Sequence, residues 1–146
     1  TKTEKFGLIN LPPGYYKLRV SDQQKMFILN FSQGIKYSLV LTPYDKLVTT
    51  TVAGYNIFYF LVPRGVKKFL CTKTVTLQLK SPSGRIIDKQ NGADESFYVD
   101  VLPGEEGIWT IEKQSGSIYL EGVPPYLGDS PSEMLISSYT GKFIKQ

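Results

Sequence analysis

The chain has 146 residues and a net charge of +4, with 41% apolar and 21% charged residues, as in ordinary globular proteins. It contains no histidine and a single cysteine, Cys71, which excludes His-dependent nucleophiles, His-ligated zinc and an internal disulfide. No window approaches the roughly 20 apolar residues of a membrane-spanning helix, and the N-terminal TKTEKFGLIN lacks the apolar core of a signal peptide.

The first third of the chain predicts short strands separated by turns. LPPG at 11–14 is a turn that leads into YYKLRV at 15–20. Because side chains alternate along a strand, one face of this strand carries a ring and two cations, Tyr15, Lys17 and Arg19. Further strands are expected at 25–31, 35–43 and 47–52.

The run YNIFYFLV at 55–62 is uncharged and ends at Pro63-Arg64-Gly65. Its short length, its β-forming residues and this abrupt end favour a strand over a buried helix. A continuous apolar run of this kind predicts a strand buried on both faces, and we expect the rest of the chain to pack around it.

Two more strands are expected at 67–73 and 74–80, and Cys71 in the first of them is expected to be a buried, inert thiol. The second strand alternates, with Gln78 on its polar side. SPSG at 81–84 predicts a hairpin turn into RIIDK at 85–89, because Pro and Gly supply the backbone angles of such turns.

After the turn signal Asn91-Gly92, the strand at 96–101 should point Phe97, Val99 and Val101 inward and Tyr98 and Asp100 outward. GIWTIEK at 107–113 and SIYLEGV at 117–123 are expected to pair as a hairpin across 114–116. Trp109 shares a face with Ile111 and is expected in the core. One helix start is predicted, the capping box Ser130 to Glu133.

These elements predict an all-β fold of about ten short strands with at most one or two short helices. Several strands alternate between a dry and a wet face, which favours an antiparallel, jelly-roll-like β-sandwich over a closed barrel. We expect residues 1–136 to form one domain and residues 137–146 to be a C-terminal tail or an edge strand.

Charge is unevenly distributed along the chain. Residues 64–89 carry seven Lys and Arg against Asp88, and residues 94–133 carry nine acids against Lys113. One interpretation is a solvated surface on which the two segments complement each other. The other is a basic face that binds an anionic polymer.

Carboxylates offer two further kinds of site. A structural calcium ion is possible at loop carboxylates, and solvated turn charges are the alternative for the same residues: Asp94, Glu95, Glu105, Glu106 and Asp129. A glycosidase needs two facing carboxylates and no histidine. The strand carboxylates that could meet across a sheet are Asp100, Glu112 and Glu121.

Tyr15, Tyr98 and Tyr119 each share a strand face with polar side chains, an arrangement that suits stacking on sugar C–H faces or ordinary cross-strand pairing. Single-strand nucleic-acid binders also expose aromatics on basic strands. No Gly-aromatic motif of that class occurs, and no nucleic-acid partner is expected. The candidate ligand-binding residues are Tyr15, Lys17, Arg19, Gln78, Tyr98, Asp100 and Tyr119.

Together, a set of segments covering about residues 11–136 resembles β-sandwich accessory modules of bacterial polysaccharide-degrading proteins. The segments are LPPGYYKLRV, YFLVPRGVKKF, LKSPSGRIIDKQ, GIWTIEKQSGSIYLEGVPP and SPSEML. The resemblance implies a jelly-roll-like, non-catalytic domain that is exported and often attached to a glycoside hydrolase or lyase. The ligand residues of such modules vary, so the candidates here come from strand geometry.

The expected function is that of a secreted carbohydrate-binding module that needs no cofactor and keeps a tethered catalytic domain near its polysaccharide. The uneven charge favours an anionic glycan. The expected location is extracellular or at the cell surface. Two alternatives stay open, a structural or adhesion domain with an exposed apolar patch, and a small carbohydrate-active enzyme that uses a carboxylate pair.

Overall fold

The structure is a computed structural model, and it describes residues 12, 16, 35, 39–40, 47–49, 56–113, 116–124, 126–128 and 130–132. Proximity of Cα atoms divides the chain into two compact units, Thr1–Phe31 and Ser32–Gln146. All strands given below belong to the second unit. The expected domain end at residue 136 lies outside the described residues and stays a prediction.

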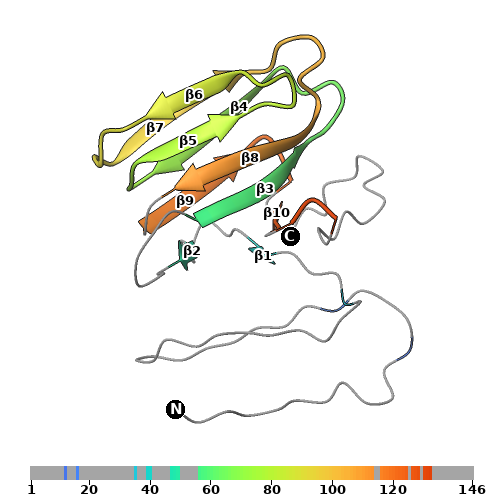
Figure 1. Cartoon of the computed structure of the whole chain (residues 1–146), viewed down its shortest axis with the longest axis horizontal. Coiled ribbons are helices and arrows are strands. Elements are labelled where there is room, and N and C mark those ends of the chain that lie inside the picture. Colours follow the sequence, from blue (N-terminus) through green and yellow to red (C-terminus); the bar gives the residue numbers. More distant parts are fainter. Residues whose placement is uncertain are drawn as a thin grey trace. The chain divides into compact units, whose positions relative to one another are not determined.

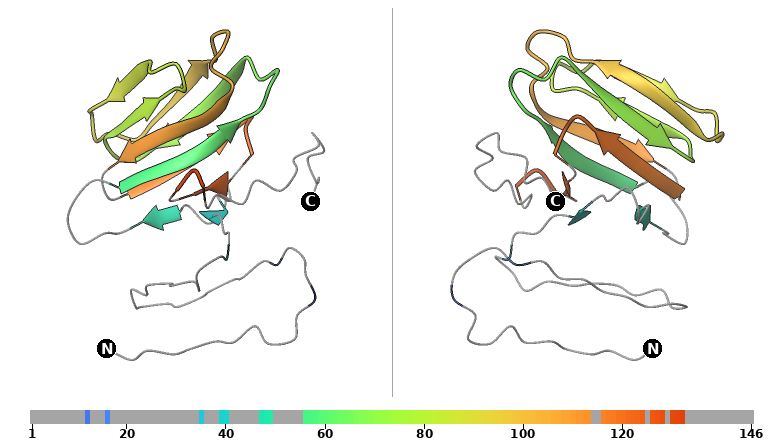
Figure 2. Two further views of the ribbon diagram at one scale, coloured as in Figure 1. Left: turned by 45° about the vertical axis from the view of Figure 1, so that its right-hand side comes forward. Right: turned by 180° about the vertical axis from the view of Figure 1, so that it is seen from behind.

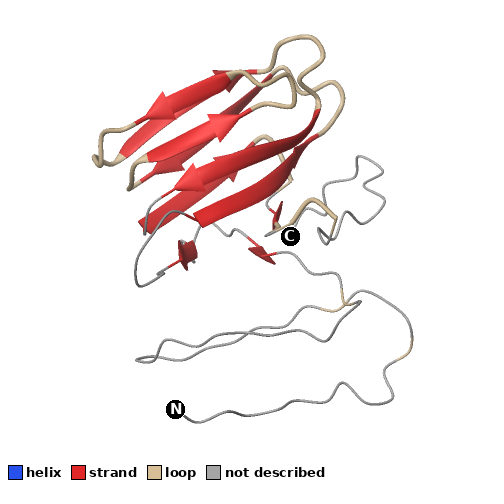
Figure 3. Cartoon of the chain, viewed as in Figure 1, coloured by secondary structure: helices blue, strands red, loops and turns tan. Residues whose placement is uncertain are grey.

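The described residues form strands, turns and loops without a helix (Figure 3). This confirms the all-β class for that part of the chain. The strands are β1 (Leu39–Val40), β2 (Leu47–Thr49), β3 (Asn56–Val62), β4 (Lys68–Lys73), β5 (Leu77–Lys80), β6 (Ile86–Lys89), β7 (Glu95–Asp100), β8 (Gly107–Lys113), β9 (Gly116–Glu121) and β10 (Tyr126–Leu127).

Two four-stranded sheets and one strand pair organise these elements, and every pairing is antiparallel. The first sheet has the order β3-β8-β5-β6, and these strands lie side by side in Figure 1. The second sheet has the order β2-β9-β4-β7 and is seen from behind in Figure 2. The short strands β1 and β10 pair with each other.

One hydrophobic core joins the two four-stranded sheets. Phe60 and Trp109 come from the first sheet and Phe69 from the second. The Phe69 ring lies 5.5 Å from each of the other two ring centroids, edge-on to both. The expected core position of Trp109 is confirmed, since its side chain is fully buried. Contacts between rings of different sheets fix the layers against each other.

Cys71 of β4 is buried in the same core, as expected. Burial raises the pKa of its thiol to about 12, because a thiolate would lose its hydration there. The thiol therefore stays protonated and unreactive at neutral pH.

Burial of β3 differs from the expectation. Phe58, Phe60 and Val62 are buried, but Ile57 is 50% exposed, so the prediction of burial on both faces was wrong. The strand lies at the edge of the first sheet, with β8 on one side and a bridge from Tyr59 to Gly128 on the other. Only one face of this sheet meets the core, so alternate side chains of an apolar strand still point outward.

The expected hairpin between β8 and β9 was also wrong. β8 pairs with β3 and β5 in the first sheet, whereas β9 pairs with β2 and β4 in the second. Gly116 has a φ of 144° where β9 begins, and a Cβ there would lie 1.7 Å from Cγ1 of Val75. Glycine thus lets the chain turn a tight corner from one sheet to the other.

Local turn and strand signals were more reliable. The SPSG hairpin is confirmed: Gly84 has a φ of 89° and its N–H donates to the Ser81 carbonyl at 2.9 Å. The alternation expected for 74–80 and 96–101 is confirmed as well. At the predicted helix start, Ser130 Oγ accepts from the N–H of Ser132 at 3.3 Å, and Glu133 lies outside the described residues.

Candidate functional site

The second sheet brings together three of the seven predicted ligand-binding residues. Tyr98 and Asp100 of β7 and Tyr119 of β9 share its outer face. Gln78, the fourth candidate among the described residues, lies on β5 in the first sheet and so does not share a face with Tyr98. The remaining three candidates lie outside the described residues: Tyr15, Lys17 and Arg19.

The register shows which side chains are neighbours on this outer face. Across strand β4, Asp100 is opposite Lys68, and Tyr98 is opposite Leu70, which has Glu121 on its other side. We call this surface the tyrosine face. Its residues are Lys68, Leu70, Thr72, Ser96, Tyr98, Asp100, Ser117, Tyr119 and Glu121.

Tyr98 is the most exposed large hydrophobic residue among those described, with 69% of its surface exposed. Lys68 Nζ lies 5.5 Å from the ring centroid and 3.3 Å from Oδ1 of Asp100. Both charged side chains are themselves more than half exposed. The ring therefore has an ammonium beside it that also pairs with a carboxylate, it stands on the edge strand β7, which is paired with β4 along its length, and a ligand can reach it.

Tyr119 lies diagonally across β4 from Tyr98. It is half-buried and packs partly against the core. Two strand spacings across the sheet and two residues along it separate the two Cα atoms by about 12 Å. Between them, the hydroxyls of Thr72 and Ser96 are hydrogen-bonded to each other at 2.9 Å. The face thus offers two separated rings with hydroxyls between them.

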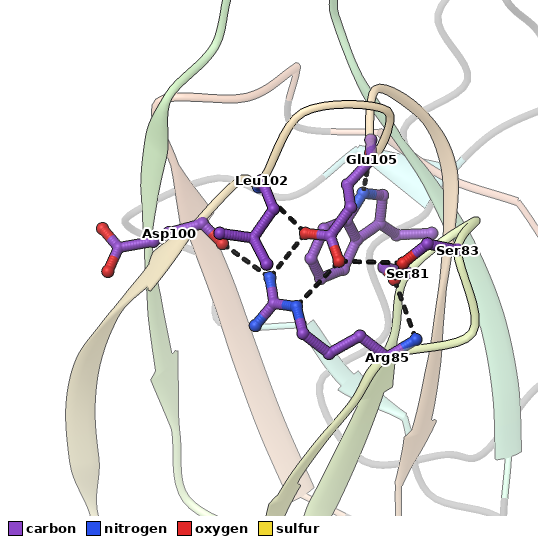
Figure 4. A network of polar contacts seen from close by, with 7 residues as sticks. Ser81, Ser83, Arg85, Asp100, Leu102 and Glu105 are labelled. Carbon is purple, nitrogen blue, oxygen red and sulfur yellow. Dashed lines mark hydrogen bonds and ion pairs between the residues drawn. The ribbon is translucent and has the colours of Figure 1, made fainter.

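A second cluster, which the sequence did not reveal, lies where the β5–β6 turn meets the β7–β8 loop (Figure 4). Arg85 donates to Glu105 through Nε at 2.7 Å and through Nη2 at 2.6 Å. The same Nη2 donates to the carbonyl of Asp100 at 2.7 Å. Trp109 donates its Nε1–H to the carbonyl of Glu105 at 2.7 Å. We call Arg85, Glu105 and Trp109 the Arg85 clamp.

Glu105 is 1% exposed, so the interpretation as a solvated turn charge was wrong for this residue. Besides Arg85, its carboxylate accepts from the Ser83 hydroxyl at 2.9 Å and the Leu102 N–H at 3.0 Å. The hydrogen bonds from Arg85, with smaller contributions from Leu102 and Ser83, lower its pKa to about 2. Through these hydrogen bonds, the Glu105 carboxylate holds the β5–β6 turn and the β7–β8 loop together.

The sequence contained one hint of this clamp. A buried Trp ring needs an acceptor for its N–H, and that acceptor is expected on a neighbouring turn. Nothing in the spacing pointed to Arg85, which is 20 residues away from Glu105.

A similar contact ties the loop before β7 to the core. The ammonium of buried Lys73 donates to the carbonyls of Asn91 and Ala93 at 2.6 and 3.0 Å, and lies 3.5 Å from Glu95. Lys89 donates to the same carboxylate at 2.7 Å. The pKa of Glu95 is lowered mainly by the hydrogen bond from Lys89, which favours the charged carboxylate. The positive charges of Lys89 and Lys73 lower it further.

All four ion pairs found among the described residues join a base from 64–89 to an acid from 94–133. The two oppositely charged segments therefore neutralise each other within the fold, as the self-complementary interpretation predicts. This leaves fewer unpaired bases for a basic face.

The three strand carboxylates that could have met across one sheet are divided between the two four-stranded sheets. Glu112 belongs to the first sheet, whereas Asp100 and Glu121 belong to the second. Within the ranges that the structure describes, no group of three or more Cys, Asp and Glu side chains is placed to hold a metal ion. Those ranges also contain no helix with the length and apolar character needed to cross a membrane.

Comparison of the chain with protein-family models, curated proteins and solved structures gives no match. The chemistry of the tyrosine face is therefore the basis for inferring function.

Proposed function

We propose that this chain is a non-catalytic carbohydrate-binding module of a larger, secreted bacterial enzyme that degrades polysaccharides. The observation behind the proposal is the tyrosine face, where a ring that is 69% exposed lies beside an exposed ammonium that also pairs with an exposed carboxylate. The module would hold a tethered catalytic domain near its polymer and so raise the effective concentration of substrate.

An antiparallel β-sandwich of jelly-roll-like form is part of the same proposal. Two four-stranded antiparallel sheets that share one core support it. In such a fold the outer face of a sheet is a rigid platform, and its side chains lose little further freedom when a ligand binds. A sugar ring can stack its C–H face on Tyr98 while its hydroxyls bond to neighbouring polar side chains.

The charges on the tyrosine face favour a neutral glycan over the anionic one expected from the sequence. The face carries one base, Lys68, against the two acids Asp100 and Glu121. The anionic preference depended partly on Lys17 and Arg19, which lie outside the described residues. It depended also on bases of 64–89 that form the ion pairs described above.

Binding measurements on the isolated chain test the proposal. A screen of polysaccharides by affinity gel electrophoresis selects a ligand, and calorimetry with the wild type and Tyr98→Ala follows. We expect the substitution to weaken binding by about 1 kcal/mol or more, a factor of about five. Tyr126→Ala is the matched control, because Tyr126 is also exposed but lies outside the tyrosine face.

The salt dependence of the affinity distinguishes a neutral glycan from an anionic one in the same experiment. Raising the salt from 0.1 to 1 M shortens the Debye length from about 10 to about 3 Å and weakens exposed charge contacts. Binding of a neutral glycan should survive this change. Equal affinities of the wild type and Tyr98→Ala, or preference for a uronic or sulfated polymer that disappears in high salt, would contradict the proposal.

Absence of catalysis is tested by incubating the chain with the same polysaccharides. We expect no release of reducing ends. Turnover that is lost in Asp100→Asn, Glu112→Gln or Glu121→Gln would instead favour the enzyme alternative. The adhesion alternative requires a contiguous apolar patch. The exposed Ile57 and Ile86 stand on the two opposite edge strands of the first sheet, β3 and β6, so these two residues do not form such a patch with each other.

A further inference from the structure

The outer face of the first sheet carries a row of polar side chains that the tyrosine face does not use. Gln78 of β5 is directly opposite Glu112 of β8 on one side and Asp88 of β6 on the other. Side chains that are directly opposite have Cβ atoms about 4.5–5.5 Å apart. The row therefore places an amide between two carboxylates, all within reach of one small ligand.

A depression of about 200 Å³ lies beside this row, lined by Thr76, Leu77, Gln78, Gln90 and Glu112. This volume suits a single sugar ring, since drug-sized ligands occupy roughly 300–1,000 Å³. Gln90 donates its Nε2–H to Oδ1 of Asp88 at 2.5 Å. That contact uses the amide nitrogen of Gln90 and leaves its carbonyl oxygen as an acceptor.

The Thr76 hydroxyl is buried without a hydrogen-bond partner in the described part of the chain. A buried hydroxyl without a partner is unfavourable. The wall of the depression therefore contains a hydroxyl that no described residue satisfies.

We propose that this depression, which we call the Gln78 site, binds one residue of a neutral glycan through two neighbouring hydroxyls. A hydroxyl both donates and accepts, so a pair can donate to the two oxygens of Glu112 and accept from the Gln78 amide. Among the described residues no Lys or Arg lines the depression, which argues against an anionic ligand, and four of the five lining side chains are polar. The class of ligand rests on the proposed function; the site itself does not.

The two sites lie on opposite sheets, so a module with both could hold two glycan chains, or two stretches of one chain, at once. Linking two weak sites in this way raises the overall affinity for a polymer without changing the affinity for a short oligosaccharide.

Amide proton–nitrogen correlation spectra of the whole chain test the Gln78 site. The probes are neutral tetrasaccharides of glucose, xylose, mannose and galactose, added one at a time. We expect at least one of them to shift amides of β5, β6 and β8, and Glu112→Gln to weaken this response about tenfold. Gln keeps the shape of Glu but replaces one of the two accepting oxygens by an NH2 group, which only donates, so two hydroxyls can no longer each donate to a separate charged oxygen.

Glu106→Gln is the matched control, because Glu106 lies in the loop before β8, outside both the tyrosine face and the lining of the depression, and its neutralisation should leave the Gln78 site unchanged. Shifts confined to β4, β7 and β9 would overturn the Gln78 site and leave the proposed function standing. Shifts confined to β5, β6 and β8 would support the site and overturn the tyrosine face. No response to any probe, or the same shifts with calcium chloride alone, would overturn the Gln78 site.

Discussion

The Arg85 clamp and the tyrosine face contain the same three kinds of group, a cation, a carboxylate and an aromatic ring. In the clamp, the guanidinium carbon of Arg85 lies 5.6 Å from the centroid of Trp109. On the tyrosine face, the ammonium of Lys68 lies 5.5 Å from the centroid of Tyr98. The composition of the two clusters is therefore not what distinguishes them.

What distinguishes them is access to water. The carboxylate side chain is 2% exposed for Glu105 in the clamp and 72% exposed for Asp100 on the tyrosine face. Glu105 accepts hydrogen bonds from several donors, and its ion pair closes at 2.6 Å, against 3.3 Å for Asp100. Buried polar groups whose hydrogen bonds are all satisfied within the protein stabilise the fold. Exposed polar groups that bond mainly to water are available to a ligand.

The largest difference should appear when each carboxylate is neutralised. Glu105→Gln removes the charge that Arg85 and the Leu102 N–H contact, in a place that water does not reach. We expect it to lower the free energy of unfolding by about 3 kcal/mol, the scale for breaking a buried ion pair. Urea denaturation followed by Trp109 fluorescence measures it, because the ring lies in the clamp.

Asp100→Asn is the matched change on the tyrosine face. Exposed ion pairs contribute about 0–1 kcal/mol, so this variant should unfold within about 0.5 kcal/mol of the wild type. Equal losses of stability in the two variants would show that burial does not separate the clusters.

The dependence of stability on pH provides a further test of the same comparison. Because Arg85 lowers the pKa of Glu105 from its ordinary 4.5 to about 2, the folded state favours the ionised carboxylate. Its contribution of about 3 kcal/mol is fully present above pH 4.5 and is lost as the pH falls through about 2. Urea midpoints measured from pH 5 down to pH 2 should fall steeply in the wild type. In Glu105→Gln that loss should be smaller, and an unchanged pH profile would refute the pKa shift.

The contrast also explains which features the sequence predicted. Alternation and turn residues act over a few neighbours, so the SPSG turn, the outward Tyr98 and the buried Trp109 were predicted correctly. The same signals cannot tell a hairpin from a corner between sheets. β8 and β9 lie in different sheets because β8 pairs with β3 and β9 pairs with β4, and these partners are far away in the sequence.

The candidate site was predictable only to the extent that it depends on strand faces. Tyr98, Asp100 and Tyr119 each lie on the outward side of their strand, as local alternation predicted, but the sequence did not place Tyr119 on the same face as the other two. Gln78 points outward too, but on the other sheet, and alternation carries no information about which sheet a strand joins. The Arg85 clamp was missed since its partners come from two loops that only the fold brings together.

The rings provide a smaller test than the carboxylates. Trp109→Phe keeps an aromatic side chain in the core but removes the N–H that donates to the carbonyl of Glu105. That carbonyl is left without this donor, and we expect a loss of about 1–2 kcal/mol in urea denaturation, followed by circular dichroism. Tyr98→Phe should change stability by less than about 0.5 kcal/mol, because its ring is in water. A larger effect of Tyr98→Phe would mean that the tyrosine face has a structural role.

The smallest expected effect is that of Lys68→Ala. Its ammonium touches the most exposed ring and the most exposed carboxylate of the comparison, so its charge contacts are screened by water and salt. We expect a change of less than about 0.5 kcal/mol in the free energy of unfolding at 0.1 M salt and none that is measurable at 1 M. A neutral glycan should still bind within about twofold of the wild type, since stacking on Tyr98 does not need the ammonium.

Lys68 is thus the residue at which the two roles separate most clearly. The clamp would lose its function without its cation, because Glu105 would be left buried and unpaired. The tyrosine face should keep its ring, and with it the contact proposed for a sugar, when its cation is gone. Calorimetry with the selected glycan and urea denaturation, both on Lys68→Ala, measure the two quantities in one variant. A loss of stability above about 2 kcal/mol would show that the exposed cluster is a second clamp and not a ligand surface.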